Sequence, residues 1–356
     1  MKAAISILAL SAASAAFAAV PPRPPITGVS HIAVYAADPA KSERFYVRDL
    51  GAVKAPDPES SKVVRYYFSS TQFVEVLPLP ATERLARESP AGATERLARE
   101  SPAGVTELPA GAGPSSINRL DHVAFTTPDV QALRAYLLGS HVAVTQAIQK
   151  GSDGSQWLDV TDPEGNKIEF VQPAGRGAGD TGGAGGAPIV PVNPLSSHII
   201  HVGFIVHDRA REDAFFRTVL GFRPYWYGGM QDDKPNWVSQ QVPDGTDWLE
   251  YMLVGKPDGR GIPPDMTAAT LGVLDHFSLG VANAEAAYTL LWNGDRLEGQ
   301  KEVPKIGRDA KWQLNLYDPD GTRAEIMELR AIGKPDRKST RLNSSHPVSS
   351  RMPSSA

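Results

Sequence analysis

Four segments of the chain repeat one alternation of apolar and polar positions, each a short strand entered by a histidine. Bulky apolar side chains alternate there with the histidine and with a small residue two positions further on. Side chains of a strand alternate between its two faces, so one face is apolar and the other holds an imidazole beside open space. This pattern predicts four copies of one module, each packing its apolar face against a helix. The repeats are His31-Ile-Ala-Val, His122-Val-Ala-Phe, His201-Val-Gly-Phe and His276-Phe-Ser-Leu.

A second apolar run in each module carries a glutamate at a near-constant distance from the histidine. Its apolar neighbours again fall on the opposite face, so each glutamate shares a face with its histidine if both strands belong to one sheet. A carboxylate on the inner side of a sheet needs a cation or hydrogen bonds. The glutamates are Glu75, Glu169, Glu250 and Glu325, which follow their histidines by 44, 47, 49 and 49 residues.

Between the two strands, capping residues and turns predict a helix followed by further strands. In the first module Asp38 precedes a helix that Gly51 ends. In the second and fourth modules, the proline-glycine turns at 162–165 and 318–321 lead into the glutamate strand. The third module has one extra residue between its glycine and Glu250, which would turn this glutamate to the other face unless the loop absorbs it.

Strict alternation also places Asp121 and Asp275 across the strand from the histidines that follow them. This position favours a role at the strand entrance over a role as metal ligand.

A glycine-rich linker over 173–196 divides the chain into a first half, 27–172, and a second half, 197–330. The sequence leaves open whether module one pairs with two and three with four, or one with four and two with three. A perfect tandem repeat over 81–104 reads as a surface loop, and the serine-rich tail 337–356 reads as non-native. The four modules span 27–80, 118–172, 197–255 and 270–330.

The N-terminus and the composition narrow the classes of function. Residues 1–19 have the lysine, the apolar run and the Ala16-Phe17-Ala18 site of a signal peptide cleaved near Ala18, so we expect a secreted or periplasmic protein without a membrane span. The net charge of −4 and the absence of a basic stripe argue against nucleic acid as a partner. The chain has no cysteine, which excludes disulfides and thiolate metal sites.

Imidazole and carboxylate are ligands for divalent metals such as zinc, nickel, manganese and iron. Two facing modules would offer two histidines and two glutamates, leaving coordination positions for a substrate. One isolated strand histidine would more often be structural, but four recurrences, each with its glutamate, favour a metal site.

On these repeats the chain resembles the vicinal oxygen chelate superfamily, which includes glyoxalase I, extradiol dioxygenases, epimerases and bleomycin or fosfomycin resistance proteins. The most specific segments are Asp121-His122-Val123 with 162–169, and Asp275-His276-Phe277 with 318–325. The resemblance implies an α+β fold of four βαβββ modules, paired into two curved mixed-sheet half-barrels around divalent metals. It also implies one site of His31, Glu75, His122 and Glu169, and another of His201, Glu250, His276 and Glu325.

Three functions fit this reading. The first is a glyoxalase-like lyase or isomerase, in which a metal chelates two vicinal oxygens of a small-molecule substrate and a glutamate, Glu169 or Glu325, moves the proton. The second is an extradiol ring-cleaving dioxygenase, although no histidine lies between His207 and His276 to act as its acid-base group. The third is a non-catalytic protein that sequesters a small aromatic or metal-chelating compound. For any of the three we expect a monomer or homodimer. In the third module five aromatic residues either stack a flat ligand or pack in the core: Tyr225, Trp226, Tyr227, Trp237 and Trp248.

Overall fold

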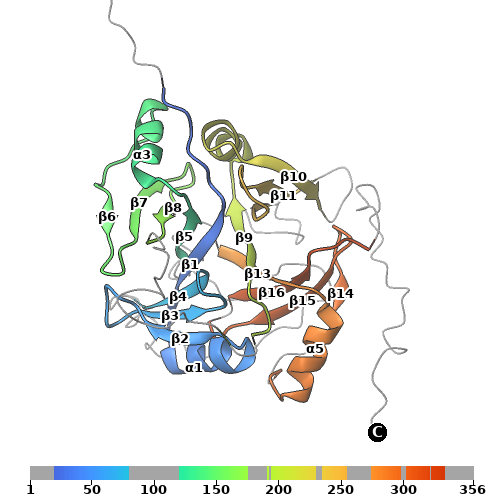
Figure 1. The fold of residues 1–356 in the computed structure, drawn as a ribbon. Coiled ribbons are helices and arrows are strands. Elements are labelled where there is room, and N and C mark those ends of the chain that lie inside the picture. Colours follow the sequence, from blue (N-terminus) through green and yellow to red (C-terminus); the bar gives the residue numbers. More distant parts are fainter. Residues whose placement is uncertain are drawn as a thin grey trace, which may run out of the picture.

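The computed structural model describes residues 20–79, 120–174, 191, 194–229, 235–254, 274–297, 302–320 and 322–332. The expected signal peptide, the tandem repeat over 81–104, the tail over 337–356 and most of the linker lie outside these residues. Each half forms one eight-stranded mixed sheet (Figure 1).

The first sheet has the strand order β2-β3-β4-β1-β5-β8-β7-β6. β1 and β5 lie antiparallel at its centre, and each is parallel to the glutamate strand of its own module, β4 or β8. Module one therefore pairs with module two. The strands are β1 (Gly28–Ala36), β2 (Val53–Pro56), β3 (Val64–Tyr67), β4 (Phe73–Pro78), β5 (Leu120–Thr126), β6 (Gln149–Lys150), β7 (Gln156–Thr161) and β8 (Lys167–Gln172).

The second sheet repeats this order as β10-β11-β12-β9-β13-β16-β15-β14, so module three pairs with module four. Its central strands β9 and β13 are antiparallel, with β12 and β16 parallel beside them. The two curled mixed sheets confirm the expected half-barrel fold. The strands are β9 (Ile199–Val206), β10 (Arg223–Gly228), β11 (Trp237–Gln241), β12 (Trp248–Leu253), β13 (Leu274–Val281), β14 (Lys305–Ile306), β15 (Trp312–Tyr317) and β16 (Arg323–Glu328).

Each module has its helix after the first strand, as the capping residues predict. Asp38, Asp129, Asp208 and Asn283 accept hydrogen bonds from backbone N–H groups of the first turn, which would otherwise lack partners. In modules one and three the α-helix continues as a π-helix that ends at a glycine with positive φ, Gly51 or Gly221. The helices are α1 (Pro39–Glu43), η1 (Arg44–Asp49), α3 (Val130–Gly139), α4 (Arg209–Asp213), η3 (Ala214–Val219) and α5 (Ala284–Asn293).

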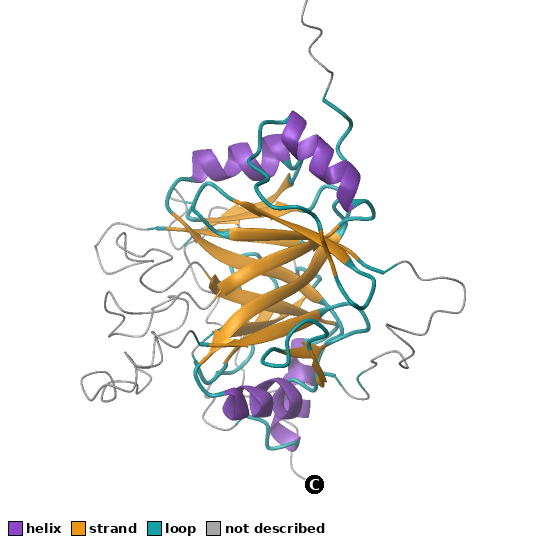
Figure 2. Ribbon diagram, turned by 90° about the vertical axis from the view of Figure 1, so that its left-hand side faces the viewer, coloured by secondary structure: helices purple, strands orange, loops and turns teal. Residues whose placement is uncertain are grey.

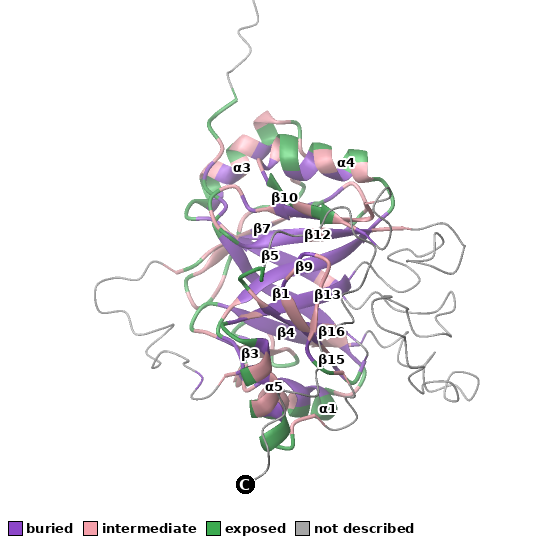
Figure 3. Ribbon diagram, turned by 90° about the vertical axis from the view of Figure 1, so that its right-hand side faces the viewer, coloured by how far each residue is buried: buried purple, intermediate pink, exposed green. Residues whose placement is uncertain are grey.

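The helices lie at two ends of the molecule and the sheets lie between them (Figure 2). α3 and α4 share one end, and α1 and α5 share the other (Figure 3). Each end therefore combines one module from each half. The apolar faces of both sheets and the helices form one continuous buried core, in which Tyr46 stacks near Phe277 and Phe125 contacts Phe222 edge-on.

A pseudo-two-fold pair of contacts joins the central strands of the two halves. Gln72, three residues before Glu75, exchanges hydrogen bonds of 3.0 and 3.1 Å with the backbone of Ile199 on β9. Asp247, three residues before Glu250, accepts a 2.9 Å hydrogen bond from the backbone N–H of Val29 on β1. These contacts thus connect each half to the central histidine strand of the other half, β9 or β1.

Among the residues that the structure describes, none of the helices is both long enough and apolar enough to span a membrane.

Candidate metal centres

A β-bulge precedes the histidine in all four modules. The pairing of the central strands skips one residue there, because it passes from Val29 to His31 in β1 and from Leu120 to His122 in β5. In the second half the skipped residues are Ile200 and Asp275. A bulge breaks the strict alternation of side chains, so the skipped residue and its histidine can project to the same side.

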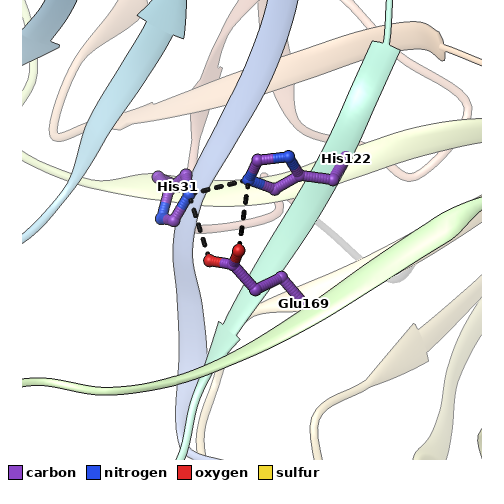
Figure 4. Close-up of side chains that lie close together, drawn as sticks. All are labelled: His31, His122 and Glu169. Atoms are coloured by element: carbon purple, nitrogen blue, oxygen red, sulfur yellow. Dashed lines mark hydrogen bonds and ion pairs between the residues drawn. The ribbon is translucent and has the colours of Figure 1, made fainter. Parts of the chain in front are cut away.

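The first-half cluster consists of His31, His122 and Glu169 (Figure 4). The Nε2 atoms of the two histidines lie 3.0 Å apart, and Glu169 approaches them at 3.5 and 3.8 Å. All three side chains are buried. The histidines come from the two central strands β1 and β5 and the glutamate from β8, so the cluster spans both modules of this half.

The second-half cluster consists of His201, His276, Glu250 and Glu325. Its two Nε2 atoms lie 2.8 Å apart. Glu325 lies 3.4 Å from Nε2 of His201, and Glu250 lies 3.4 Å from Nε2 of His276 and 4.0 Å from Nε2 of His201. The loop before β12 absorbs the extra residue of the third module, because Glu250 pairs with Gly203 on the histidine side. Two imidazoles and two carboxylates therefore converge.

Carboxylates orient one histidine in each cluster. Nδ1 of His122 lies 2.7 Å from Asp121, and Nδ1 of His276 lies 2.7 Å from Asp275. The prediction that these aspartates lie across the strand from their histidines was wrong, because the bulge brings both to the histidine side. A carboxylate that binds Nδ1 in this way fixes the imidazole tautomer and makes Nε2, which points into the cluster, a stronger metal ligand.

Burial and neighbouring charges give the two histidines of each cluster different pKa values. Burial and the neighbouring imidazole lower the pKa of His31 and of His201. Burial and Arg323 also act to lower the pKa of His276, but its hydrogen bonds to Asp275 and Glu250 outweigh them and raise it to about 9. Without a cation, one imidazole of each pair therefore binds a proton more readily than the other.

The carboxylates of the clusters also respond to burial. It raises the pKa of Glu169 to about 7 and raises the pKa of Glu325. Oε2 of Glu325 has no hydrogen-bond partner within the described part of the chain, and the same holds for Nδ1 of His201. Burial disfavours the negative charge of both carboxylates, so a cation beside them would stabilise their ionised form.

Both clusters fit a divalent ion. Donor atoms of His31, His122 and Glu169 lie within 4.8 Å of one another, and so do those of His201, Glu250 and His276. Glu325 joins the second group through its 3.4 Å approach to His201. Ligand atoms placed ~2.0–2.2 Å from a shared ion lie at least ~3 Å from each other, which is close to the separations found here. Nitrogen and oxygen donors suit zinc, manganese, iron and nickel alike, so the donor set leaves the metal's identity open.

A cavity of about 140 Å³ opens beside the second-half cluster. Four of the five aromatic residues that the sequence offered as a stacking surface line it: Tyr225, Trp226, Trp237 and Trp248. Lys311 lies in the same wall, with its Nζ 3.2 Å from the hydroxyl of Tyr225 and 3.5 Å from the carboxylate of Asp309. Sequence reasoning missed this lysine, which follows an irregular turn without a repeated pattern.

The structure brings together seven of the eight residues that the sequence proposed as ligands. The eighth, Glu75, lies on the same face, but its Oε1 accepts a 3.0 Å hydrogen bond from Arg65. Within the part of the chain that the structure describes, no ion pair joins Glu75 to His31 or His122.

Comparisons with known proteins place these clusters in a wider context. The model of one family, described as the Glyoxalase/Bleomycin resistance protein/Dioxygenase superfamily, matches residues 28–170 and 198–326. No curated protein matches the chain.

Among solved structures, homoprotocatechuate 2,3-dioxygenase from Brevibacterium fuscum, in complex with 3,4-dihydroxyphenylacetate, is 16% identical, with a TM-score of 0.57 over 90% of this chain and 86% of that one. The 2,3-dioxygenase LapB from Pseudomonas sp. KL28 is 14% identical, with a TM-score of 0.54 over 86% and 93%. A Mn(II)-bound glyoxalase from Novosphingobium aromaticivorans is 14% identical, with a TM-score of 0.55 over 86% and 83%. At such identities the likeness establishes a shared fold alone.

Proposed function

The chain belongs to the Glyoxalase/Bleomycin resistance protein/Dioxygenase superfamily, and from this premise we propose that it is a divalent-metal-dependent lyase or isomerase. Its substrate is a small molecule with oxygens on two adjacent carbon atoms. The observation that carries the proposal is the second-half cluster, where two imidazoles and two carboxylates converge beside a cavity. The Mn(II) bound to the structurally similar glyoxalase supports a divalent metal as the cofactor. The nitrogen and oxygen donors of the cluster suit zinc, nickel, manganese or iron.

A bound divalent ion would polarise the two substrate oxygens and thereby acidify the adjacent C–H bond. The protein's part is to remove and return that proton. Glu325 suits this role because its Oε2 makes no hydrogen bond among the described residues, lies 3.4 Å from Nε2 of His201, and belongs to a carboxyl group whose pKa burial raises. Glu250 instead accepts a hydrogen bond from Ser239 through Oε1 and lies 3.4 Å from Nε2 of His276 through Oε2, a position that suits a ligand. Glu169 occupies the corresponding place in the first half.

The cavity wall would orient the substrate. Lys311 is buried and its Nζ lies 4.6 Å from the ring centre of Trp248, which itself stacks on His201 at 4.5 Å. Its ammonium group can bind an anionic group of the substrate, while the aromatic rings exclude water from the reacting carbon. The cavity of about 140 Å³ suits a small molecule.

Deuterium exchange tests the reaction without knowledge of the natural substrate. The metal-loaded protein is incubated in D₂O with hydroxyacetone, glyceraldehyde and a hemithioacetal of methylglyoxal, and NMR follows the hydrogen on the carbon next to the carbonyl group. We expect metal-dependent exchange that E325Q abolishes while it still binds Co²⁺. Exchange that continues at the wild-type rate in E325Q, or no exchange with any of the three, would contradict the proposal.

Ring cleavage is a second candidate, supported by the full-length likeness to two 2,3-dioxygenases. No histidine other than His201 and His276 is among the residues that line the cavity, and Lys311, which is buried beside the cluster, is the acid-base group that we propose for this reaction. Oxygen uptake by the Fe²⁺-loaded protein with 3,4-dihydroxyphenylacetate, lost in K311M, would favour this function over the first.

We also propose that residues 1–19 direct export and are cleaved near Ala18. The alanine-rich run and the Ala-Phe-Ala site support this location. N-terminal sequencing of protein recovered outside the cytoplasm tests it, because an intact Met1 there would contradict cleavage.

A further inference from the structure

The two halves hold one of their two candidate glutamates differently, Glu75 in the first half and Glu250 in the second. In each half, the residue that pairs with the glutamate across the neighbouring strand contacts its side chain. That residue is Arg65 for Glu75 and Ser239 for Glu250. Nε of Arg65 donates to Oε1 of Glu75 at 3.0 Å, whereas the hydroxyl of Ser239 donates to Oε1 of Glu250 at 3.2 Å.

The charge of this partner accounts for the position of the glutamate. Glu250 accepts from a neutral hydroxyl through one oxygen, and its other oxygen lies 3.4 Å from Nε2 of His276. Glu75 is paired with a guanidinium, and among the residues described it forms no ion pair with either histidine. The arginine therefore takes the place that a metal ion would take beside this carboxylate.

Arg65 is held in place by more than Glu75. Its Nη2 lies 2.6 Å from Asp57, its Nη1 lies 3.8 Å from Asp153, and its Cζ lies 4.6 Å from the ring centre of Phe73. Phe73 stacks in turn on His31, with ring centres 4.4 Å apart and planes inclined by 12°. A planar guanidinium that is packed on a ring and paired with carboxylates loses little freedom by staying there.

The second half also has a cation and a histidine against one aromatic ring, but its cation comes from a different part of the module. Trp248, two residues before Glu250, stacks on His201, and the ammonium group of Lys311 lies 4.6 Å from the centre of the Trp248 ring. Lys311 comes from the turn before β15 and pairs with Asp309, so the cation of this half leaves Glu250 free. In each half a cation and a histidine thus contact the same aromatic ring, but only in the first half does this cation bind the glutamate.

We propose that the residue opposite the last-strand glutamate, Arg65 or Ser239, determines how many protein ligands each half offers to a metal. The first half then presents three groups to a metal, and the second half presents four. One chain would hold two metal sites of unlike affinity. This inference rests on the proposed metal binding but is independent of the proposed reaction.

Co²⁺ titration, followed by visible absorption and calorimetry, tests the proposal in full-length chains with one half disabled. In an H276A background, which leaves the first half, we expect R65S to bind Co²⁺ at least ~10-fold more tightly, since changes around a ligand shift affinity by ~10–100-fold. R65K keeps a cation beside Glu75 and is expected to match the parent. E75Q added to R65S should abolish the gain.

The reciprocal exchange uses an H122A background, which leaves the second half. We expect S239R to weaken Co²⁺ binding by at least ~10-fold, and S239A, which only removes a neutral hydrogen bond, to change it little. R65S removes the cation that pairs with Asp57, so circular dichroism is used to check that the R65S variant still folds. If R65S does not fold, the S239R measurement alone decides the proposal. Binding that is no tighter in a folded R65S, or no weaker in S239R, overturns the proposal. Deuterium exchange is measured separately, so its failure would count against the reaction only.

Discussion

A single residue before each histidine decides how its imidazole is held. The four bulges place Ser30, Asp121, Ile200 and Asp275 beside the following ring. Serine and aspartate reach Nδ1 at 2.7 to 3.2 Å, but isoleucine cannot, and Nδ1 of His201 is unpartnered within the described residues. The second half therefore relies on Asp275 to orient its pair of histidines.

We predict that D275N weakens metal binding by the second half by ~10–100-fold. The asparagine can still accept from Nδ1 of His276, but it no longer offsets the guanidinium of Arg323, whose Nη2 lies 2.7 Å from that nitrogen. The imidazole becomes a weaker ligand. Competition with a chelating dye measures the affinity.

D121N is the matched variant in the first half and should weaken that site alone. An equal affinity in D275N and the wild type would show that Asp275 serves the strand and not the histidine. Alternation along the sequence could not reveal these aspartates, because one inserted residue in the pairing reverses the faces. The histidines themselves were found because their pattern repeats.

At the scale of elements, α4 carries a buried acid. Glu212 is 1% exposed, and neither carboxylate oxygen has a hydrogen-bond partner among the described residues. Burial, together with Asp162 and Glu164 from the turn before β8, raises its pKa to about 9. Asp213, Arg211 and Arg217 lie along its own helical segment. The fourth residue of α1 in module one is Ser42, whereas the fourth residue of α4 is Glu212. The buried acid is therefore not repeated in module one.

The raised pKa predicts a loss of stability with rising pH. Unfolded Glu212 ionises near pH 4.5 and folded Glu212 near 9, so between these values the folded state holds one proton more. The free energy of unfolding then falls by up to ~1.4 kcal/mol per pH unit from this group. E212Q should remove that slope, which urea unfolding at pH 5, 7 and 9 measures.

E212Q and the wild type should differ little at pH 5 and most at pH 9, with the variant more stable. E59Q, at an exposed loop position, is the control for loss of charge. Parallel slopes in E212Q and the wild type would contradict a raised pKa.

Sequence patterns predicted the order of elements better than their local form. The spacing of histidine and glutamate indicated the modules, and aspartate and glycine indicated the helix ends. The π-helical turns at η1 and η3 and the short strands β6 and β14 left no periodic signal, because tertiary packing decides them.

At the scale of the whole molecule, the halves depend on each other. The amide of Gln72 makes three buried hydrogen bonds, one with Val29 of its own sheet and two with Ile199 across the boundary between the sheets. The core is continuous across the same boundary. The order of pairing could not be read from four similar modules, because each presents the same apolar face.

We predict that Q72A lowers the free energy of unfolding by roughly 3 kcal/mol. The change leaves buried backbone groups of both halves without partners, and each unsatisfied group costs ~1–3 kcal/mol. Guanidinium unfolding measures the difference. Q149A, whose amide makes one exposed local bond, is the control and should change stability by less than ~0.5 kcal/mol. A similar loss in both variants would argue against the role of Gln72 at the boundary.

The repetition of the site predicts that one chain binds two ions independently. The clusters lie in separate sheets and share no ligand, so removing one should leave the other intact. Elemental analysis should find two equivalents in the wild type and one each in H122A and H276A, with H141A unchanged. Each ion held at 100 times its Kd adds ~2.7 kcal/mol to the free energy of unfolding, so each single variant should lose the part of the metal-induced stabilisation that its own site contributes. Loss of both equivalents from H276A alone would mean that the first half binds only through the second, because two independent clusters cannot empty together.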